Sequence, residues 1–289
     1  MDASLILRDL AEARSPGIAR SQRIARAVRA LTLGLASSGA TEAAELERQL
    51  VEAVRRPLPR PRVVAVLSGS GGTGATTTAA GIATTLAALR DDPAVLVDAQ
   101  TGAGSLADRL TGDRRGPAAP TVRDVARDGD RAVSRTTRSG LGVVDAAPHR
   151  DPVTRAGLRR VLASLTVRHA FVVLDLGDDP GDLALLADRA VVVTAPTAAA
   201  VDGARLTLDR LWRADPGTAA AAAVAVVCPA PAAHRRLVRR LHEEISADVA
   251  RLVLVPHDRA LCRPGPLEPA DLRPATREAF LALAALTAS

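Results

Sequence analysis

The stretch that decides the fold is Val63-Val-Ala-Val-Leu-Ser-Gly-Ser-Gly-Gly-Thr-Gly-Ala-Thr-Thr-Thr78. Its apolar run, Val63 to Leu67, predicts a buried parallel strand, because such strands are covered on both faces. Four glycines within six residues follow, and a helix is expected from about Ala75 to Leu89. A strand, a glycine loop and a helix in this order surround an anion with backbone N–H groups. The stretch therefore predicts a phosphate-binding loop.

The spacing Gly69-x-x-x-x-Gly74-x-Thr76 is that of a P-loop, GxxxxGK[ST], except that Ala75 stands at the lysine position. That lysine normally reaches the β- and γ-phosphates. The chain contains no lysine, and all 38 of its basic residues are arginine. The loop can still offer N–H groups to a phosphate and the Thr76 hydroxyl to Mg²⁺. The nucleotide-binding candidates in the loop are Ser70, Gly71, Gly72, Thr73, Gly74, Ala75, Thr76 and Thr77.

Two other interpretations of the glycines are open at this point. The cluster can be a tight turn without a ligand. It also fits the dinucleotide fingerprint G-x-G-x-x-G at Gly69, Gly71 and Gly74, with Asp98 placed 24 residues after Gly74. The fingerprint expects an acidic residue about 20 residues further on.

The composition sets further limits. Apolar residues make up 47% of the 289 residues and aromatic residues only 1%, so the core is expected to consist of Ala, Val and Leu. The net charge of +6 allows weak attraction to nucleic acid or acidic membranes, or an inert basic surface. Cys228 and Cys262 show no metal or redox spacing, which is typical of a reducing compartment. Without a signal-peptide pattern or a long apolar run, a cytoplasmic location and no membrane span are expected.

Three segments are expected along the chain. Residues 1–56 are predicted to form a basic helical extension, and residues 57–61 a stiff proline-rich linker. Residues 62–289 are predicted to form the P-loop domain. The extension carries Arg20, Arg23, Arg26 and Arg29 on an amphipathic pattern. Such a helix can contact DNA, a membrane or a protein partner, or form a solvated face packed on the main domain.

Apolar runs alternate with helical patterns after the linker. Strands are expected near 63–67, 94–99, 140–147, 170–176, 189–194, 219–228 and 252–255, and helices near 75–89, 105–110, 153–165, 198–212, 233–246 and 275–288. This alternation predicts an α/β fold with a mostly parallel sheet of about seven strands and helices on both faces.

Asp98 and Asp175 each end an apolar strand. Ligands of open α/β sheets bind outside the carboxyl ends of the strands, so both carboxylates are expected to face the glycine loop. With Thr76 they are the candidate Mg²⁺ ligands. The alternative is that each Asp only caps the turn after its strand.

From Arg62 onward the chain resembles the MinD/ParA family of deviant P-loop ATPases. The matching segments are Ser70–Thr77, Val95–Asp98, Ser139–Pro148, Phe171–Asp175, Asp188–Pro196 with Gly203-Ala204, and Val255–Asp258. The resemblance implies that Asp175 lies on the Walker B strand and that Pro256 lies in a loop near the base. Four positions depart from the family pattern. The signature lysine falls on Ser70, the P-loop lysine on Ala75, the water-orienting Asp on Gln100 and the adenine-reading Asn on Cys228.

The resemblance implies a protein that binds ATP or ADP with Mg²⁺, forms a homodimer and acts with a protein partner as a positioning, scaffold or regulatory factor. The substitutions imply little or no hydrolysis, and no catalytic residue is assigned. The two lost lysines resemble the TadZ/CpaE-like branch, although residues 1–56 are too short for the receiver-like domain of that branch. Three alternatives stay open: an active atypical ATPase using Arg114 or Arg115, an interaction module without nucleotide, and a dinucleotide-dependent enzyme.

Overall fold

A computed structural model describes residues 40–100, 106–111, 120–133, 137–146, 153–178, 180–230, 251–263 and 266–289. The basic pattern of Arg20, Arg23, Arg26 and Arg29 lies outside these residues. So do Arg114, Arg115 and the helix expected at 233–246.

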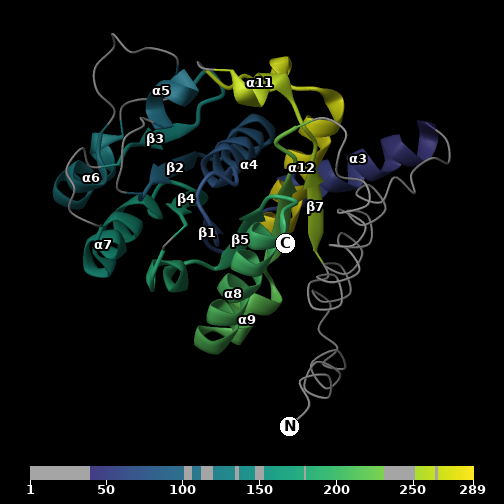
Figure 1. The fold of residues 1–289 in the computed structure, drawn as a ribbon. Helices are drawn as coiled ribbons and strands as arrows, with labels where there is room; N and C mark the ends of the chain where they lie inside the picture. Colours follow the sequence, from purple (N-terminus) through teal and green to yellow (C-terminus); the bar gives the residue numbers. More distant parts are fainter. Residues whose placement is uncertain are drawn as a thin grey trace.

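Seven strands form one sheet in the order β3-β2-β4-β1-β5-β6-β7, and every neighbouring pair is parallel (Figure 1). The strands are β1 (Arg62–Ser68), β2 (Ala94–Asp98), β3 (Gly142–Val144), β4 (Phe171–Gly177), β5 (Arg189–Thr194), β6 (Ala223–Val227) and β7 (Leu252–Val255). The predicted parallel α/β fold is confirmed. Strand β4 separates β1 from β2, whereas β1 pairs with β2 in the 3-2-1-4-5-6 order of dinucleotide-binding sheets. The sheet therefore does not support the dinucleotide alternative.

The described helices lie before, between and after the strands and cover both faces of the sheet. The longer ones are α3 (Ala40–Arg55), α4 (Ala75–Leu89), α7 (Arg155–Leu165), α8 (Ala198–Ala214) and α12 (Pro274–Ala288). The shorter ones are α5 (Leu106–Thr111), α6 (Val122–Asp128), α9 (Pro216–Ala220) and α11 (Arg259–Cys262), with 3₁₀ turns η1 (Gly129–Ala132), η2 (Leu183–Leu186) and η3 (Pro269–Asp271). None of the helices in the described ranges is long and apolar enough to cross a membrane.

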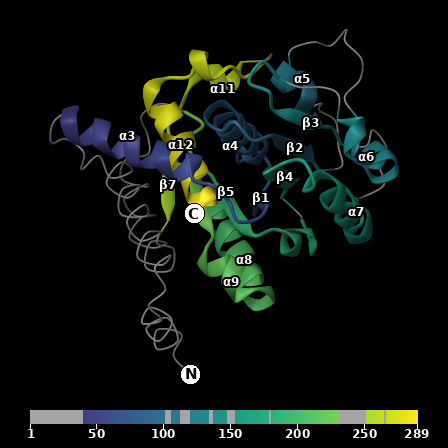
Figure 2. The ribbon, with the colours of Figure 1, turned by 180° about the vertical axis from the view of Figure 1, so that it is seen from behind.

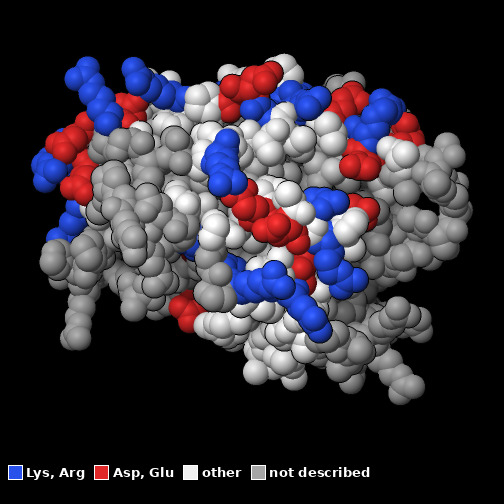
Figure 3. All heavy atoms as spheres, turned by 90° about the horizontal axis from the view of Figure 1, so that it is seen from above, with Lys and Arg blue, Asp and Glu red and all other residues white. Residues whose placement is uncertain are grey.

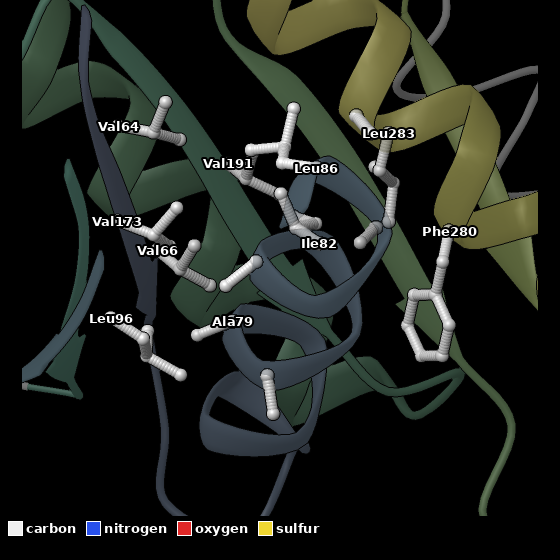
Figure 4. Close-up of a cluster of buried hydrophobic side chains, with 14 of the residues drawn as sticks. Val64, Val66, Ala79, Ile82, Leu86, Leu96, Val173, Val191, Phe280 and Leu283 are labelled. Atoms are coloured by element: carbon white, nitrogen blue, oxygen red, sulfur yellow. The ribbon is translucent and has the colours of Figure 1, made fainter. Parts of the chain in front are cut away.

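Alternating residues of each strand face two separate cores. On one face Val64, Val66, Leu96 and Val173 pack against α4 and α12 (Figure 4). On the other face the alternate residues, such as Val63 and Val97, pack against α6, α7 and α8. Since side chains alternate along a strand, this pattern also decides which face each strand-end carboxylate occupies.

Helices α4 and α12 approach closely at one point. A Cβ atom added to Gly81 of α4 would lie 2.5 Å from Cζ of Phe280 in α12, which is closer than atoms can pack. The aromatic ring thus occupies space that only glycine leaves open. Because α4 begins at the glycine loop, this contact helps to fix the helix that positions the site.

Helix α3 packs beside α12 and α4, as Figure 1 and the reverse view in Figure 2 show. Its residues Leu50 and Val54 belong to the same core as α4 and α12. Arg90, directly after α4, has a side chain that is only 4% exposed and pairs with Asp92. Its guanidinium donates to the carbonyl oxygens of Val54 and Arg56, the latter at 2.8 Å. The end of α4 is therefore fastened to the end of α3.

Candidate nucleotide-binding site

The glycine loop joins β1 to α4 and has the backbone of an anion cradle. Gly72 and Gly74 adopt left-handed φ angles of 75° and 94°, which glycine tolerates without strain. Gly74 is the N-cap of α4, and within the described residues no side chain caps the free N–H groups of the first turn. These N–H groups and the positive end of the helix are thus available to a phosphate.

Two hydroxyl groups brace the loop from inside. The Oγ of Ser68 donates to the carbonyl oxygen of Ser70 at 3.0 Å, and Oγ1 of Thr73 donates to the same oxygen at 3.2 Å. Thr73 is buried, while Gly71 and Gly72 are exposed. The loop therefore keeps its shape through its own side chains and presents its glycines to solvent.

Helix α8 supports the loop from one side. A Cβ on Gly203 of α8 would lie 2.7 Å from the carbonyl oxygen of Gly69, so the two backbones touch. On the outer side, a Cβ on Gly71 would meet Oδ2 of Asp178 at 3.1 Å. Glycine at these positions lets both the helix and the acidic side chain come against the loop.

Asp98 and Asp175 are direct neighbours in the sheet, because they are register partners on β2 and β4. Asp98 follows the alternation of Leu96, and Asp175 that of Val173, so both side chains project toward α4. Both residues are buried. This register places the two carboxylates on the face of the sheet that α4 covers.

Gln100 links this pair to the first turn of α4. Its Nε2 donates to Oγ1 of Thr76 at 3.0 Å, and its backbone N–H donates to Oδ1 of Asp98 at 3.0 Å. The amide also rests on Gly177, where a Cβ would lie 2.7 Å from Oε1 of Gln100. Thr76, Asp98, Gln100 and Asp175 thus form one connected polar group at the carboxyl ends of β2 and β4.

Burial controls the ionisation of the two carboxyls. It raises the pKa of Asp98 to about 7, with further contributions from the nearby Asp175 and Asp145 charges, while the Gln100 N–H acts in the opposite direction. Burial also raises the pKa of Asp175, against the lowering effects of Thr76, Gln100 and the Gly177 N–H. Removing two acidic groups from water disfavours their charged forms. A bound cation or hydrogen-bond donor would lower both pKa values and so favour the charged carboxylates.

These groups fit a divalent cation. Oδ2 of Asp175 is buried and has no hydrogen-bond partner among the described residues, although Thr76 and Gln100 lie near enough to lower the pKa of the carboxyl. One hydroxyl and two carboxylates are the oxygen ligands that Mg²⁺ prefers beside phosphates. The described residues hold no cluster of three or more His, Cys, Asp or Glu side chains, so such a cation would also rely on Thr76 and phosphate oxygens.

The two lysine positions are occupied by small residues. Ser70 contributes a carbonyl oxygen to the loop bracing, and Ala75 is the buried first residue of α4. Thr77 is half-buried in the same turn. A cavity of about 460 Å³ adjoins Gln100 and Asp178, and Arg155 is the one cation in its described lining. Arg155 is paired with Asp182 at 2.9 Å.

The two positions predicted to lie near the base, Cys228 and Pro256, directly follow β6 and β7. Pro256 follows β7 and lines a separate cavity of about 150 Å³ beside α12. Cys228 is half-buried, its N–H donates to the carbonyl oxygen of Val255 at 3.0 Å, and burial raises the pKa of its thiol. Asp258 caps α11 and also accepts from the Arg273 N–H at 2.8 Å. Its carboxylate is therefore committed to holding the segment before α12.

Two acidic residues near the site were missed by the sequence analysis. Asp145 lies close enough to raise the pKa of Asp98, and its Oδ1 accepts from the Ala107 N–H at 3.1 Å. It directly follows β3, much as Asp98 is the last residue of β2, so the same search for an Asp at the end of an apolar run could have found it. Asp178 gave no such signal, because its place beside Gly71 depends on the turn after β4.

No protein-family model and no curated protein sequence matches the chain. Solved structures do match it. A ParA family ATPase from Chlorobium tepidum TLS superposes with a TM-score of 0.62 and 15% identity, over 78% of this chain and 98% of that chain. The MinD protein of Pyrococcus horikoshii OT3, complexed with Mg-ADP, gives 0.59 and 19%, over 78% and 94%. A plasmid partition protein of Borrelia burgdorferi B31, bound to AMPPNP, gives 0.61 and 16%, over 78% and 98%.

The chain has the fold of the ParA and MinD ATPases. The resemblance inferred from its loop and strand motifs is confirmed at the level of the fold.

Proposed function

We propose that this chain is a MinD/ParA-like protein that binds ATP or ADP and serves as a positioning, scaffold or regulatory factor with little or no hydrolysis. Such a factor would act in placing a component at a cell pole, in positioning a secretion or pilus machine, or in partitioning chromosomal DNA. The observation that carries the proposal is the contrast within one loop. The left-handed Gly72 and Gly74 preserve the phosphate cradle, while Ser70 and Ala75 leave it without lysine.

Nucleotide binding is supported by groups that do not depend on lysine. The N–H groups at the start of α4 have no side-chain cap, and anions bind readily at such helix ends. Two of the solved structures with this fold carry Mg-ADP or AMPPNP. Thr76, Asp98 and Asp175 would supply the oxygen ligands of any divalent cation that accompanies the nucleotide.

Weak hydrolysis follows from the missing groups. Loss of one well-placed donor to the transition state costs about 10²–10³ in rate. Here two lysines are absent, and Gln100 replaces the carboxylate that orients water in the family pattern. Bound nucleotide would then act by stabilising one state of the protein, for which we propose a homodimer, rather than by turnover.

The experiment is calorimetry of the full chain with ATP and ADP, with and without Mg²⁺, together with light scattering and phosphate release. Gly72→Ala is the test variant and Gly140→Ala the matched control. Both residues have φ near 75–80° and open space around a Cβ atom, so both substitutions impose similar backbone strain. Only Gly72 lies in the loop.

We expect micromolar binding by the wild-type chain, a shift toward dimer and little phosphate release. Both alanine variants should lower the melting temperature similarly, but only Gly72→Ala should weaken binding. Phosphate release at the rate of an intact ATPase of this fold would contradict the proposal. Absence of binding by the wild-type chain would favour a nucleotide-free interaction module.

A further inference from the structure

The carboxamide of Gln100 lies among the groups that would hold a cation. Its Nε2 contacts Oγ1 of Thr76, its backbone N–H contacts Asp98, and its side chain is close enough to Asp175 to lower the pKa of that carboxyl. An amide NH₂ group carries two hydrogens and a partial positive charge. It therefore supplies, beside Thr76, Asp98 and Asp175, part of the positive charge that a metal ion would otherwise supply.

The orientation of the amide follows from its surroundings. Oε1 faces Gly177, where a Cβ would lie 2.7 Å away, and Nε2 faces Thr76. Turning the amide over would direct Oε1 toward the Asp175 carboxylate, whose oxygens are acceptors, whereas Nε2 in the observed orientation lowers the pKa of that carboxyl as a donor does. Gln100 consequently approaches the pair as a donor and not as an oxygen ligand.

From this geometry we infer that Gln100 takes the place of the divalent cation, through its Nε2 contact with Thr76 beside Asp175, and makes the site bind nucleotide without Mg²⁺. The inference deepens the proposed function, since it specifies the ionic form of the nucleotide that the loop accepts. The Nε2 contact occupies one of the two lone pairs of Thr76 Oγ1, so a metal ion would compete with the amide for that oxygen. Entry of a cation requires the amide to leave, and the adjoining cavity of about 460 Å³ is where it would go.

The test measures metal binding directly, by electron paramagnetic resonance of Mn²⁺ added to the nucleotide-free full chain. Wild type is compared with Gln100→Ala, which removes the amide, and with Gln100→Asp, which also adds a carboxylate. Asp175→Asn in each background identifies the site. Circular dichroism and melting curves report whether each variant is folded.

We expect the wild-type chain to show no Mn²⁺ signal that depends on Asp175. Gln100→Ala and Gln100→Asp should gain one, with an affinity about 10- to 100-fold above the upper limit that the wild-type titration sets, the range seen when outer-shell partners of metal ligands change. Wild-type binding that Asp175→Asn abolishes would overturn the inference. Failure of both Gln100 variants to gain a site would overturn it equally.

A second titration, of ADP in EDTA, separates this inference from the proposed function. Binding in EDTA that Mg²⁺ leaves within about twofold would support both. Binding that needs Mg²⁺ in the wild-type chain would overturn the inference and leave nucleotide binding standing. No ADP binding in either buffer would count against the proposed function, while the Mn²⁺ result would still decide the role of Gln100.

Discussion

Gly69 and Gly203 touch through their backbones, although one begins the phosphate loop and the other lies in α8. The contact makes α8 the support against which the loop rests. A methyl group at residue 203 would sit 2.7 Å from the Gly69 carbonyl oxygen, and neither backbone can yield without moving the loop.

Gly203→Ala should therefore weaken ADP binding roughly tenfold, because overpacking costs about 1–3 kcal/mol and about 1.4 kcal/mol corresponds to a factor of ten. Calorimetry measures the affinity. Asp202→Ala, which changes the exposed neighbour on the same helix, is the control and should bind normally. Equal affinities of Gly203→Ala and wild type would show that α8 does not set the loop geometry.

The stability of the metal-free protein should depend on Asp98. Its pKa is about 7 in the folded protein and 3.8 as the ordinary value, so the folded state keeps a proton that the unfolded state releases. The free energy of unfolding should thus fall as the pH rises from about 4 to about 7. Each pKa unit corresponds to about 1.36 kcal/mol, which gives an upper bound of about 4 kcal/mol.

Asp98→Asn should make this slope shallower, leaving the part that Asp175 contributes through its own raised pKa, and should exceed wild type in stability at pH 8, as measured by urea unfolding in EDTA across the pH range. Asp91→Asn, at an exposed turn residue, controls for the loss of one carboxyl. Parallel pH profiles of Asp98→Asn and wild type would contradict the assignment.

The close contact between Gly81 and Phe280 predicts that Gly81→Ala lowers the free energy of unfolding, whereas helix propensity alone predicts that it raises it. Gly81→Ala should lose about 1–3 kcal/mol through overpacking, more than the roughly 0.5–1 kcal/mol that alanine gains over glycine in a helix. Chemical unfolding measures both effects. In a Phe280→Leu background the same change should be neutral or stabilising, and a persistent loss there would exclude the ring as the cause.

Hydrolysis should be partly recoverable by replacing the missing groups. Ala75→Lys combined with Gln100→Asp restores two positions of the family pattern, and each transition-state group contributes about 10²–10³ in rate. Phosphate release should rise at least tenfold over wild type. Ala75→Met combined with Gln100→Asp is the control, because methionine has a side chain of similar length to lysine but without its charge. If it releases phosphate as fast, the lysine charge is not what the loop lacks.

The strands and long helices were predictable because their signals are local. Apolar runs such as Val63–Leu67 and Phe171–Leu176 admit few conformations other than buried strands, and each is followed by turn residues. The sequence also placed Asp98 at the end of its strand and Asp175 near the end of its own, although β4 continues two residues further, to Gly177. That these two are direct neighbours required the strand order, in which β4 enters between β1 and β2.

Some short elements had local signals that were not used. Thr121 and Asp124 form a capping box that begins α6, and Asp215 with Pro216 caps α9. Both patterns are readable from sequence. In contrast, the Gln100–Thr76 hydrogen bond and the Gly69–Gly203 contact join residues 24 and 134 positions apart, so only the folded arrangement reveals them.

The contacts of Arg90 indicate how far the chain can be shortened from its N-terminal side and still fold. Its buried guanidinium is held by the carbonyl oxygens of Val54 and Arg56, and Leu50 fills part of the core beneath α12. A fragment starting at Arg62 would keep the Asp92 partner of this guanidinium but lose its two carbonyl acceptors, and it would uncover apolar surface along the C-terminal helix. We therefore expect the smallest autonomous folding unit to include α3, and a shorter fragment to recruit a second molecule or aggregate.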